Sequence, residues 1–164
     1  MVIKKSKKKR IKSKKKSIKN KLSSGVKNLL KIQIKKFGDI YKELSTNPKT
    51  YKKKTHWSWY VFPTKKIGYS DPYKTCILNI NDVNYILNNY KTRVLWIKIL
   101  DKLSKIFVIQ KNINSIPMID HNRINFFLVE WTSPIYKKII KKFPKFEKSL
   151  KLFNKNWNYY FQKL

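Results

Sequence analysis

Apolar side chains recur at steps of three and four residues along most of the chain beyond residue 25. This spacing places them on one face of a helix, whereas a half-buried strand would alternate apolar and polar residues. The first such run follows possible N-caps at Ser23 or Ser24 and stops before Asn47-Pro48. Its members are Val26, Leu29, Leu30, Ile34, Phe37, Tyr41 and Leu44. The pattern predicts a long amphipathic helix.

Later apolar runs of the same spacing predict further helices, and polar residues at their starts are candidate caps. Asp82 is expected to cap a second helix, and Asp120 is expected to begin a fourth. Ser133-Pro134 is typical of an N-cap followed by proline at the first helical position, where the missing N–H does no harm. We therefore predict an all-α bundle of five or six helices, joined in part by an aromatic-rich connecting segment.

The amino-terminal segment differs from the rest of the chain in charge. Twelve of its first 22 residues are basic and none is acidic, and it holds too few apolar side chains to offset the entropy lost on ordering. We predict a disordered lysine-rich arm over residues 1–24 and one helical domain over residues 25–164. The arm's candidate phosphate contacts are Lys7, Lys8, Lys9, Arg10, Lys14, Lys15 and Lys16.

The formal net charge of +32 on 164 residues attracts polyanions, above all nucleic acid. All but three of the 40 basic residues are lysine, and alanine is absent, which is typical of a coding sequence rich in A and T. Base composition and function are therefore alternative sources of the lysines in the domain. For the arm, the alternatives are a nucleic-acid contact, a nuclear localisation signal through KKKRIK, and an anchor at a membrane surface.

The sequence lacks the patterns of several targeting signals and ligand-binding sites. No apolar run follows the basic start as in a secretory signal, and no stretch is long and apolar enough to span a bilayer. We expect an intracellular protein in the nucleus or another nucleic-acid-rich compartment. Cys76, His56 and His121 are too few for a four-ligand zinc site, and the isolated glycines form no phosphate loop. No metal or cofactor is expected.

The segment KTHWSWYVFPT, residues 54–64, concentrates aromatic side chains. The alternation of its residues 56–63, HWSWYVFP, fits a strand. A stretch of only eight residues fits equally well an extended or helical piece that is buried on both faces. We predict a core position for Trp57, Trp59 and Phe62. His56 is expected in a structural role, its charge disfavoured by nearby lysines and by burial. The alternative is a pocket for a small molecule or nucleotide around His56, Trp57, Trp59 and Arg123, which leaves open whether the protein is an enzyme.

Asp120 and Arg123 lie three residues apart at a predicted helix start. One interpretation is a cap from Asp120 with a local ion pair to Arg123. The other adds both residues to the candidate pocket, with the planar guanidinium of Arg123 presented to a phosphate or carboxylate. Retention of arginine in a chain that favours lysine indicates that geometry matters at residue 123.

The longer segment KTHWSWYVFPTKKIGYS resembles the signature of the DUF1810 family. The matching residues are Lys54, His56, Trp57, Trp59, Phe62, Pro63, Gly68 and Ser70. The resemblance covers roughly residues 28–155 and implies a compact, largely helical fold, but no established reaction. Thr64 replaces the glutamine usual in the family, and Ile67-Gly68-Tyr69 replaces its Gly-Leu-Gly, so contacts made through that glutamine are not carried over.

A basic stripe runs through the carboxy-terminal part of the chain at three- and four-residue spacing. Its members are Lys137, Lys138, Lys141, Lys142, Lys145, Lys148 and Lys151. We take Lys138, Lys141, Lys145 and Lys148 as candidate phosphate contacts. The leading hypothesis is a sequence-nonspecific nucleic-acid-binding protein, and a basic structural component of a nucleoprotein particle is a further alternative. The sequence leaves open DNA or RNA as the partner, and the oligomeric state.

Overall fold

The computed structural model describes residues 22–65, 77 and 79–163. These residues form seven α-helices and one 3-10 helix, with no strand among them, which confirms the all-α prediction. The elements are α1 (Ser24–Leu44), α2 (Ser58–Val61), α3 (Ile80–Asn88), α4 (Tyr90–Gln110), η2 (Met118–Asp120), α5 (His121–Trp131), α6 (Pro134–Ile140) and α7 (Pro144–Phe161).

Six of the seven α-helices correspond to the apolar runs in the sequence. The seventh, α2, is a single turn within the aromatic segment, for which strand, extended and helical conformations were all open. The predicted arm over residues 1–24 lies outside the described residues as far as residue 21. Within its last residues, the Oγ atom of Ser23 accepts a hydrogen bond from Val26 N at 3.4 Å, and α1 begins at Ser24.

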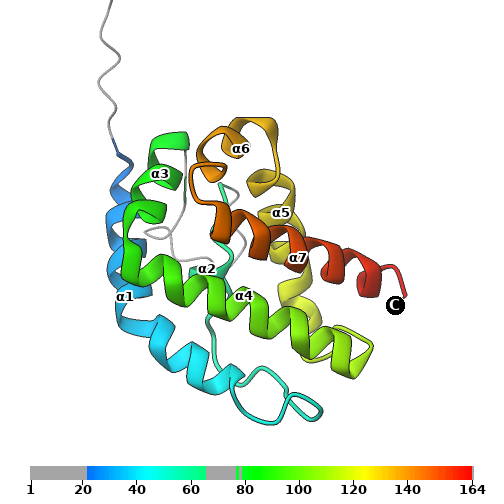
Figure 1. Cartoon of the computed structure of the whole chain (residues 1–164). Coiled ribbons are helices and arrows are strands. Elements are labelled where there is room, and N and C mark those ends of the chain that lie inside the picture. The colour runs from blue at the N-terminus through cyan, green and yellow to red at the C-terminus, as the bar shows by residue number, and fades with distance from the viewer. Residues whose placement is uncertain (1–21, 66–76, 78, 164) are drawn as a thin grey trace, which may run out of the picture.

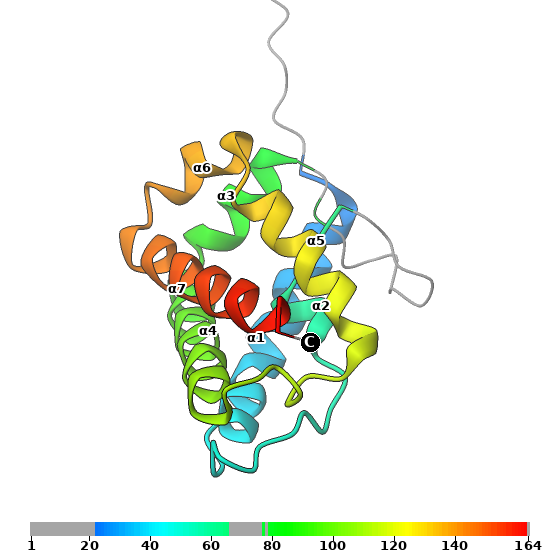
Figure 2. The ribbon, with the colours of Figure 1, turned by 90° about the vertical axis from the view of Figure 1, so that its right-hand side faces the viewer.

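The longest helices form the frame of the molecule. Helix α4 packs against α7 on one side and against α1 on the other, and α3 and α6 pack together at the same end (Figure 1). The turned view shows α2 in the interior, near α1 and α5 (Figure 2). None of the described helices is both long enough and apolar enough to cross a bilayer.

The start of α3 corrects the predicted role of Asp82. The N-cap is Asn79, whose Oδ1 atom accepts from the backbone N–H groups of Asn81 and Asp82. Asp82 is the third helical residue and accepts in return from Asn79 N, which completes a capping box. Its other carboxylate oxygen accepts from Ser23 N at 2.9 Å, so this buried side chain joins the starts of α1 and α3.

Aromatic rings fill the core between these helices. The buried ring of Trp96 on α4 has its centroid 5.0 Å from those of both Trp131 and Phe146 in edge-on contacts. Phe37 on α1 and Phe127 on α5 lie 6.0 and 6.3 Å from the same ring. Residues from α1, α4, α5 and α7 thus meet at one side chain, which explains how one aromatic cluster holds the bundle together.

Candidate functional site

The aromatic segment runs through the interior, and its backbone is bonded to the surrounding helices. Four consecutive carbonyls each accept a hydrogen bond from a different side chain on α1, α4 or α5. The pairs are Gln33 Nε2 to Tyr60 O at 2.8 Å, Trp96 Nε1 to Val61 O at 3.0 Å, Arg123 Nη1 to Phe62 O at 3.4 Å, and Trp131 Nε1 to Pro63 O at 2.9 Å. Because a buried carbonyl without a donor is costly, these side chains make burial of the segment possible.

The side chains of this segment divide between core and surface. Trp57 and Phe62 are buried, which confirms their predicted core position, whereas Trp59, for which the same position was predicted, is only half-buried. His56 is exposed, which corrects the burial expected for it from the sequence. Trp57, the next residue, is buried in the core.

Glu43, on the last turn of α1, holds the loop that leads into the aromatic segment. Its carboxylate accepts four hydrogen bonds, from Tyr51 Oη at 3.0 Å, Lys54 N at 3.0 Å, Thr55 Oγ1 at 2.6 Å and Trp57 Nε1 at 3.2 Å. Burial alone would raise the pKa of Glu43, but these donors favour the ionised form and hold the pKa below its ordinary value. Glu43 is therefore ionised when it holds this loop in place.

Asp120 makes neither of the contacts expected from the sequence. It occupies the N-cap position of α5 without a side-chain cap bond, and its Oδ2 atom lies 2.6 Å from the Nζ atom of Lys53. Both side chains are largely buried, with 5% of Lys53 and 14% of Asp120 exposed. The same ammonium lies 5.1 Å from the ring centroid of Trp57. Asp120 thus anchors the loop before the aromatic segment to the start of α5.

Arg123 lies one turn into α5 and points toward the aromatic segment. In addition to its bond to Phe62 O, its guanidinium interacts with the charge of Glu130. Burial lowers the pKa of Arg123 to about 10, while Glu130 acts in the opposite direction. Burial raises the pKa of Glu130. The backbone N–H of Lys65, which donates to its carboxylate at 2.9 Å, and the charges of Lys65 and Arg123 act in the opposite direction. The guanidinium of Arg123 thus donates to a backbone carbonyl of the same chain.

Stability in acid is expected to change in opposite directions for Glu43→Gln and Glu130→Gln. A lowered folded pKa stabilises the protein above the ordinary value of 4.5, and that stability is lost as the pH falls through the folded pKa. A raised pKa, as at Glu130, gives stability that is lost as the pH rises through the folded pKa. Urea unfolding between about pH 3 and 7 measures both.

As the pH falls, the stability advantage of the wild type over Glu43→Gln should shrink. The advantage of the wild type over Glu130→Gln should instead grow, since protonation removes a charge that burial disfavours. Each variant serves as the other's control for the general effect of acid. If the stability difference between wild type and variant changes in the same direction for both variants as the pH falls, the opposite pKa shifts of Glu43 and Glu130 would be contradicted.

The five residues of the candidate pocket are only partly brought together. Trp57 and Asp120 both contact Lys53, whereas the guanidinium of Arg123 is directed at Phe62 O. A shallow depression of about 220 Å³ lies elsewhere, between α1 and α4. Its lining residues are Tyr41, Lys98, Asp101, Lys102 and Lys105. None of the five predicted pocket residues lines this depression.

The predicted basic stripe lies on two helices and the turn between them. Lys138 belongs to α6, Lys141 to the turn, and Lys145 and Lys148 to α7, and all four side chains are exposed. Within the described part of the chain, no carboxylate pairs with any of them, whereas Lys151 bonds Glu147 at 2.7 Å. These four lysines form what we call the α6–α7 basic face. The predicted arm contacts Lys7 to Lys9, Arg10 and Lys14 to Lys16 lie outside the described residues.

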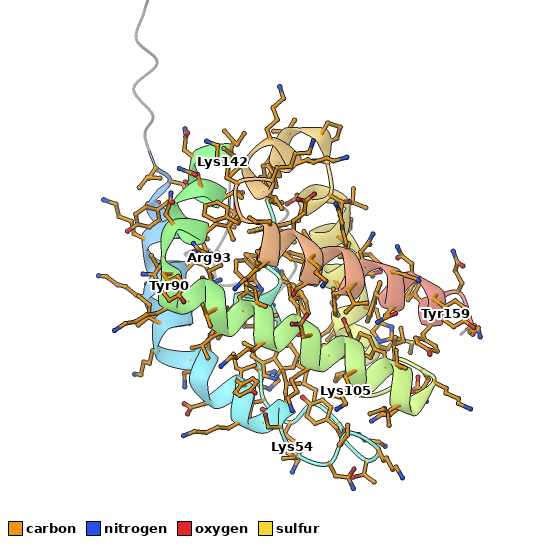
Figure 3. The ribbon with its side chains drawn as sticks, in the orientation of Figure 1. Lys54, Tyr90, Arg93, Lys105, Lys142 and Tyr159 are labelled. Atoms are coloured by element: carbon orange, nitrogen blue, oxygen red, sulfur yellow. The ribbon has the colours of Figure 1, made fainter. Side chains whose placement is uncertain are left out.

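Sequence reasoning gave no role to Arg93 and Tyr90 at the start of α4. The guanidinium of Arg93 lies over the rings of Tyr90, at 5.5 Å, and Phe143, at 4.8 Å, and donates a hydrogen bond to Leu87 O. Figure 3 shows Arg93 beside Tyr90, with Lys142 at the turn between α6 and α7. A signal was present in the sequence, because Arg93 is one of only two arginines in the domain.

Comparisons with known proteins give no further assignment. A scan against protein-family models finds no match, and searches of curated proteins and of solved structures also find none. The resemblance to the DUF1810 family therefore stays a prediction.

Proposed function

We propose that this protein binds nucleic acid without sequence specificity, through the α6–α7 basic face and the lysine-rich arm. The observation that carries the proposal is the exposure of Lys138, Lys141, Lys145 and Lys148 with no carboxylate partner among the described residues. Lysines without partners can neutralise phosphates and release the counterions bound to them, which supplies most of the affinity in nonspecific binding.

The residue types on this face favour phosphate contacts over base reading. Lysine presents a compact charge on a flexible stem, which can follow a phosphate backbone without a fixed register. Base-specific contacts in the major groove commonly use the arginine fork. Arg93 and Arg123, the two arginines of the domain, both donate to backbone carbonyls of this chain. The face therefore carries charge without the groups that usually read sequence.

A salt titration of the full-length protein tests this proposal. We expect the wild type to bind duplex DNA with a strong inverse dependence of affinity on salt. Each phosphate contact contributes roughly 0.9 to the slope of log affinity against log salt, so changing all four lysines of the basic face to glutamine should reduce the slope by up to about 3.6. Fluorescence anisotropy at several salt concentrations measures the slopes.

A matched variant distinguishes this face from net charge alone. Glutamine at Lys27, Lys31, Lys35 and Lys36 removes the same charge from exposed positions on α1, on the far side of α4 from α7. We expect this variant to keep a steeper slope than the basic-face variant. Equal slopes in the two variants would reject the face, and a wild type that binds neither duplex DNA nor single strands would reject the function. Replacing the arm residues Lys7 to Lys9, Arg10 and Lys14 to Lys16 by glutamine measures the arm's share.

A further inference from the structure

Tyr90 is the most exposed aromatic side chain among the large apolar residues that the structure describes. It is 69% exposed, compared with 54% for Tyr159 and 40% for Phe126. A single exposed tyrosine is ordinary in a soluble protein. The surroundings of Tyr90 distinguish it, because a guanidinium lies over its ring and further basic residues are close to it along the chain.

The ring of Tyr90 contacts the side chain of Arg93. Arg93, one turn along α4, places its guanidinium 5.5 Å from the centroid of Tyr90 and 4.8 Å from that of Phe143. The same guanidinium donates to the carbonyl of Leu87, which fixes its position at the end of α3. Asn89 caps α4 through Thr92 N at 3.0 Å, so the backbone that carries Tyr90 is also held. The ring therefore needs little ordering before it binds a partner.

Basic residues lie next to Tyr90 on α4 and next to Phe143, the other ring that Arg93 contacts. Lys91 follows Tyr90 on α4, and Lys141 and Lys142 precede Phe143 in the turn that Arg93 contacts, and all three lysines are exposed. Within the described residues, no carboxylate pairs with Arg93 or with these lysines. Figure 3 shows Tyr90 and Arg93 beside each other and Lys142 farther up, on the opposite side of Arg93 from Tyr90. Lys141 is also part of the α6–α7 basic face, and it lies two residues before Phe143, which Arg93 contacts.

We propose that Tyr90 is a stacking platform for an unpaired base and that the preferred ligand is single-stranded nucleic acid. The inference rests on the proposed function and names its substrate class. A base on the open side of the Tyr90 ring would extend the series formed by Tyr90, Arg93 and Phe143, while the lysines contact the flanking phosphates. Such stacking accepts any base, because each has a π-face. In a duplex the bases are already stacked and cannot reach the ring.

The test compares Tyr90→Ala and Tyr90→Phe with the wild type in the full chain. The probe is an oligonucleotide of about 12 nucleotides, a length within the range of single-strand binding sites. It carries one 2-aminopurine and is prepared as single-stranded DNA, as single-stranded RNA and as duplex DNA. We expect Tyr90→Ala to weaken single-strand binding about 5- to 150-fold and to abolish quenching of the 2-aminopurine. Tyr90→Phe should retain both, because the aromatic face is kept, and duplex affinity should change little in either variant.

Tyr159→Ala is the matched control, since Tyr159 is an exposed tyrosine on α7 that also lies beside a lysine, with Lys163 Nζ 4.0 Å from its ring centroid. It should bind as the wild type does. Equal single-strand affinity and quenching in the wild type and Tyr90→Ala would overturn the platform, while salt-dependent duplex binding would still support the proposed function. If the wild type binds neither single strands nor duplex, both proposals fall.

Discussion

Phe62→Ala is expected to lower the free energy of unfolding by about 3–5 kcal/mol. Phe62 is fully buried, and its ring centroid lies 5.3 Å from that of Phe127, 5.4 Å from that of Phe153 and 6.1 Å from that of Trp57. Truncation removes the buried ring and leaves a cavity that these rings, held by their own contacts, can fill only in part. Urea denaturation followed by far-ultraviolet circular dichroism measures the change.

Val129→Ala is the control for Phe62→Ala. Val129 lies on α5 and is 71% exposed, so its truncation should change the free energy of unfolding by no more than about 0.5 kcal/mol. A loss at Phe62 as small as the loss at Val129 would show that the aromatic segment is not part of the core.

Asp120→Ala is expected to cost about 3–5 kcal/mol, because it leaves the ammonium of Lys53 buried without its partner. The pair is 2.6 Å long and both side chains are largely buried. Lys53→Met should likewise destabilise the protein by stranding the carboxylate. The double variant should recover much of the loss, since it leaves neither charge buried without its partner. A double-mutant cycle by urea denaturation gives the coupling energy.

An exposed pair on α7 provides the comparison for this cycle. Lys151 and Glu147 lie 2.7 Å apart, but Lys151 is exposed, and such pairs contribute roughly 0.3–0.5 kcal/mol. Glu147→Gln should therefore have a small effect. Additive losses at Lys53 and Asp120, with no recovery in the double variant, would contradict a coupled pair. A ligand-binding role for Asp120 alone would predict lost binding with little change in stability.

The helices could be predicted from the sequence because their signals are local. The apolar run from Val26 to Leu44 matches α1, and the cap at Ser23 and the proline at the start of α6 lie where expected. Each of these features depends on residues within one or two turns of the chain. Periodicity and capping chemistry therefore indicate them without knowledge of the fold.

The contacts of the candidate site could not be predicted, because they join residues far apart in the sequence. Asp120 has a good local partner in Arg123 but pairs with Lys53, 67 residues away. Asp82 satisfies the pattern of an N-cap, yet Asn79 takes that position and leaves Asp82 to bond Ser23, 59 residues away. In both cases tertiary packing chose between two chemically reasonable partners. The exposure of the lysines of the basic face and the burial of Trp57 and Phe62, in contrast, could be predicted from residue type and spacing.

The row of bonded carbonyls in the aromatic segment has a consequence for how the chain folds. Its donors are 27, 35, 61 and 68 residues from their acceptors, so these bonds have a much higher contact order than the helices themselves. Helical turns form from neighbouring residues, but this row is completed only when α1, α4 and α5 have all arrived around it. We therefore expect this segment to be buried late in folding, since pairing all four carbonyls requires α1, α4 and α5 together.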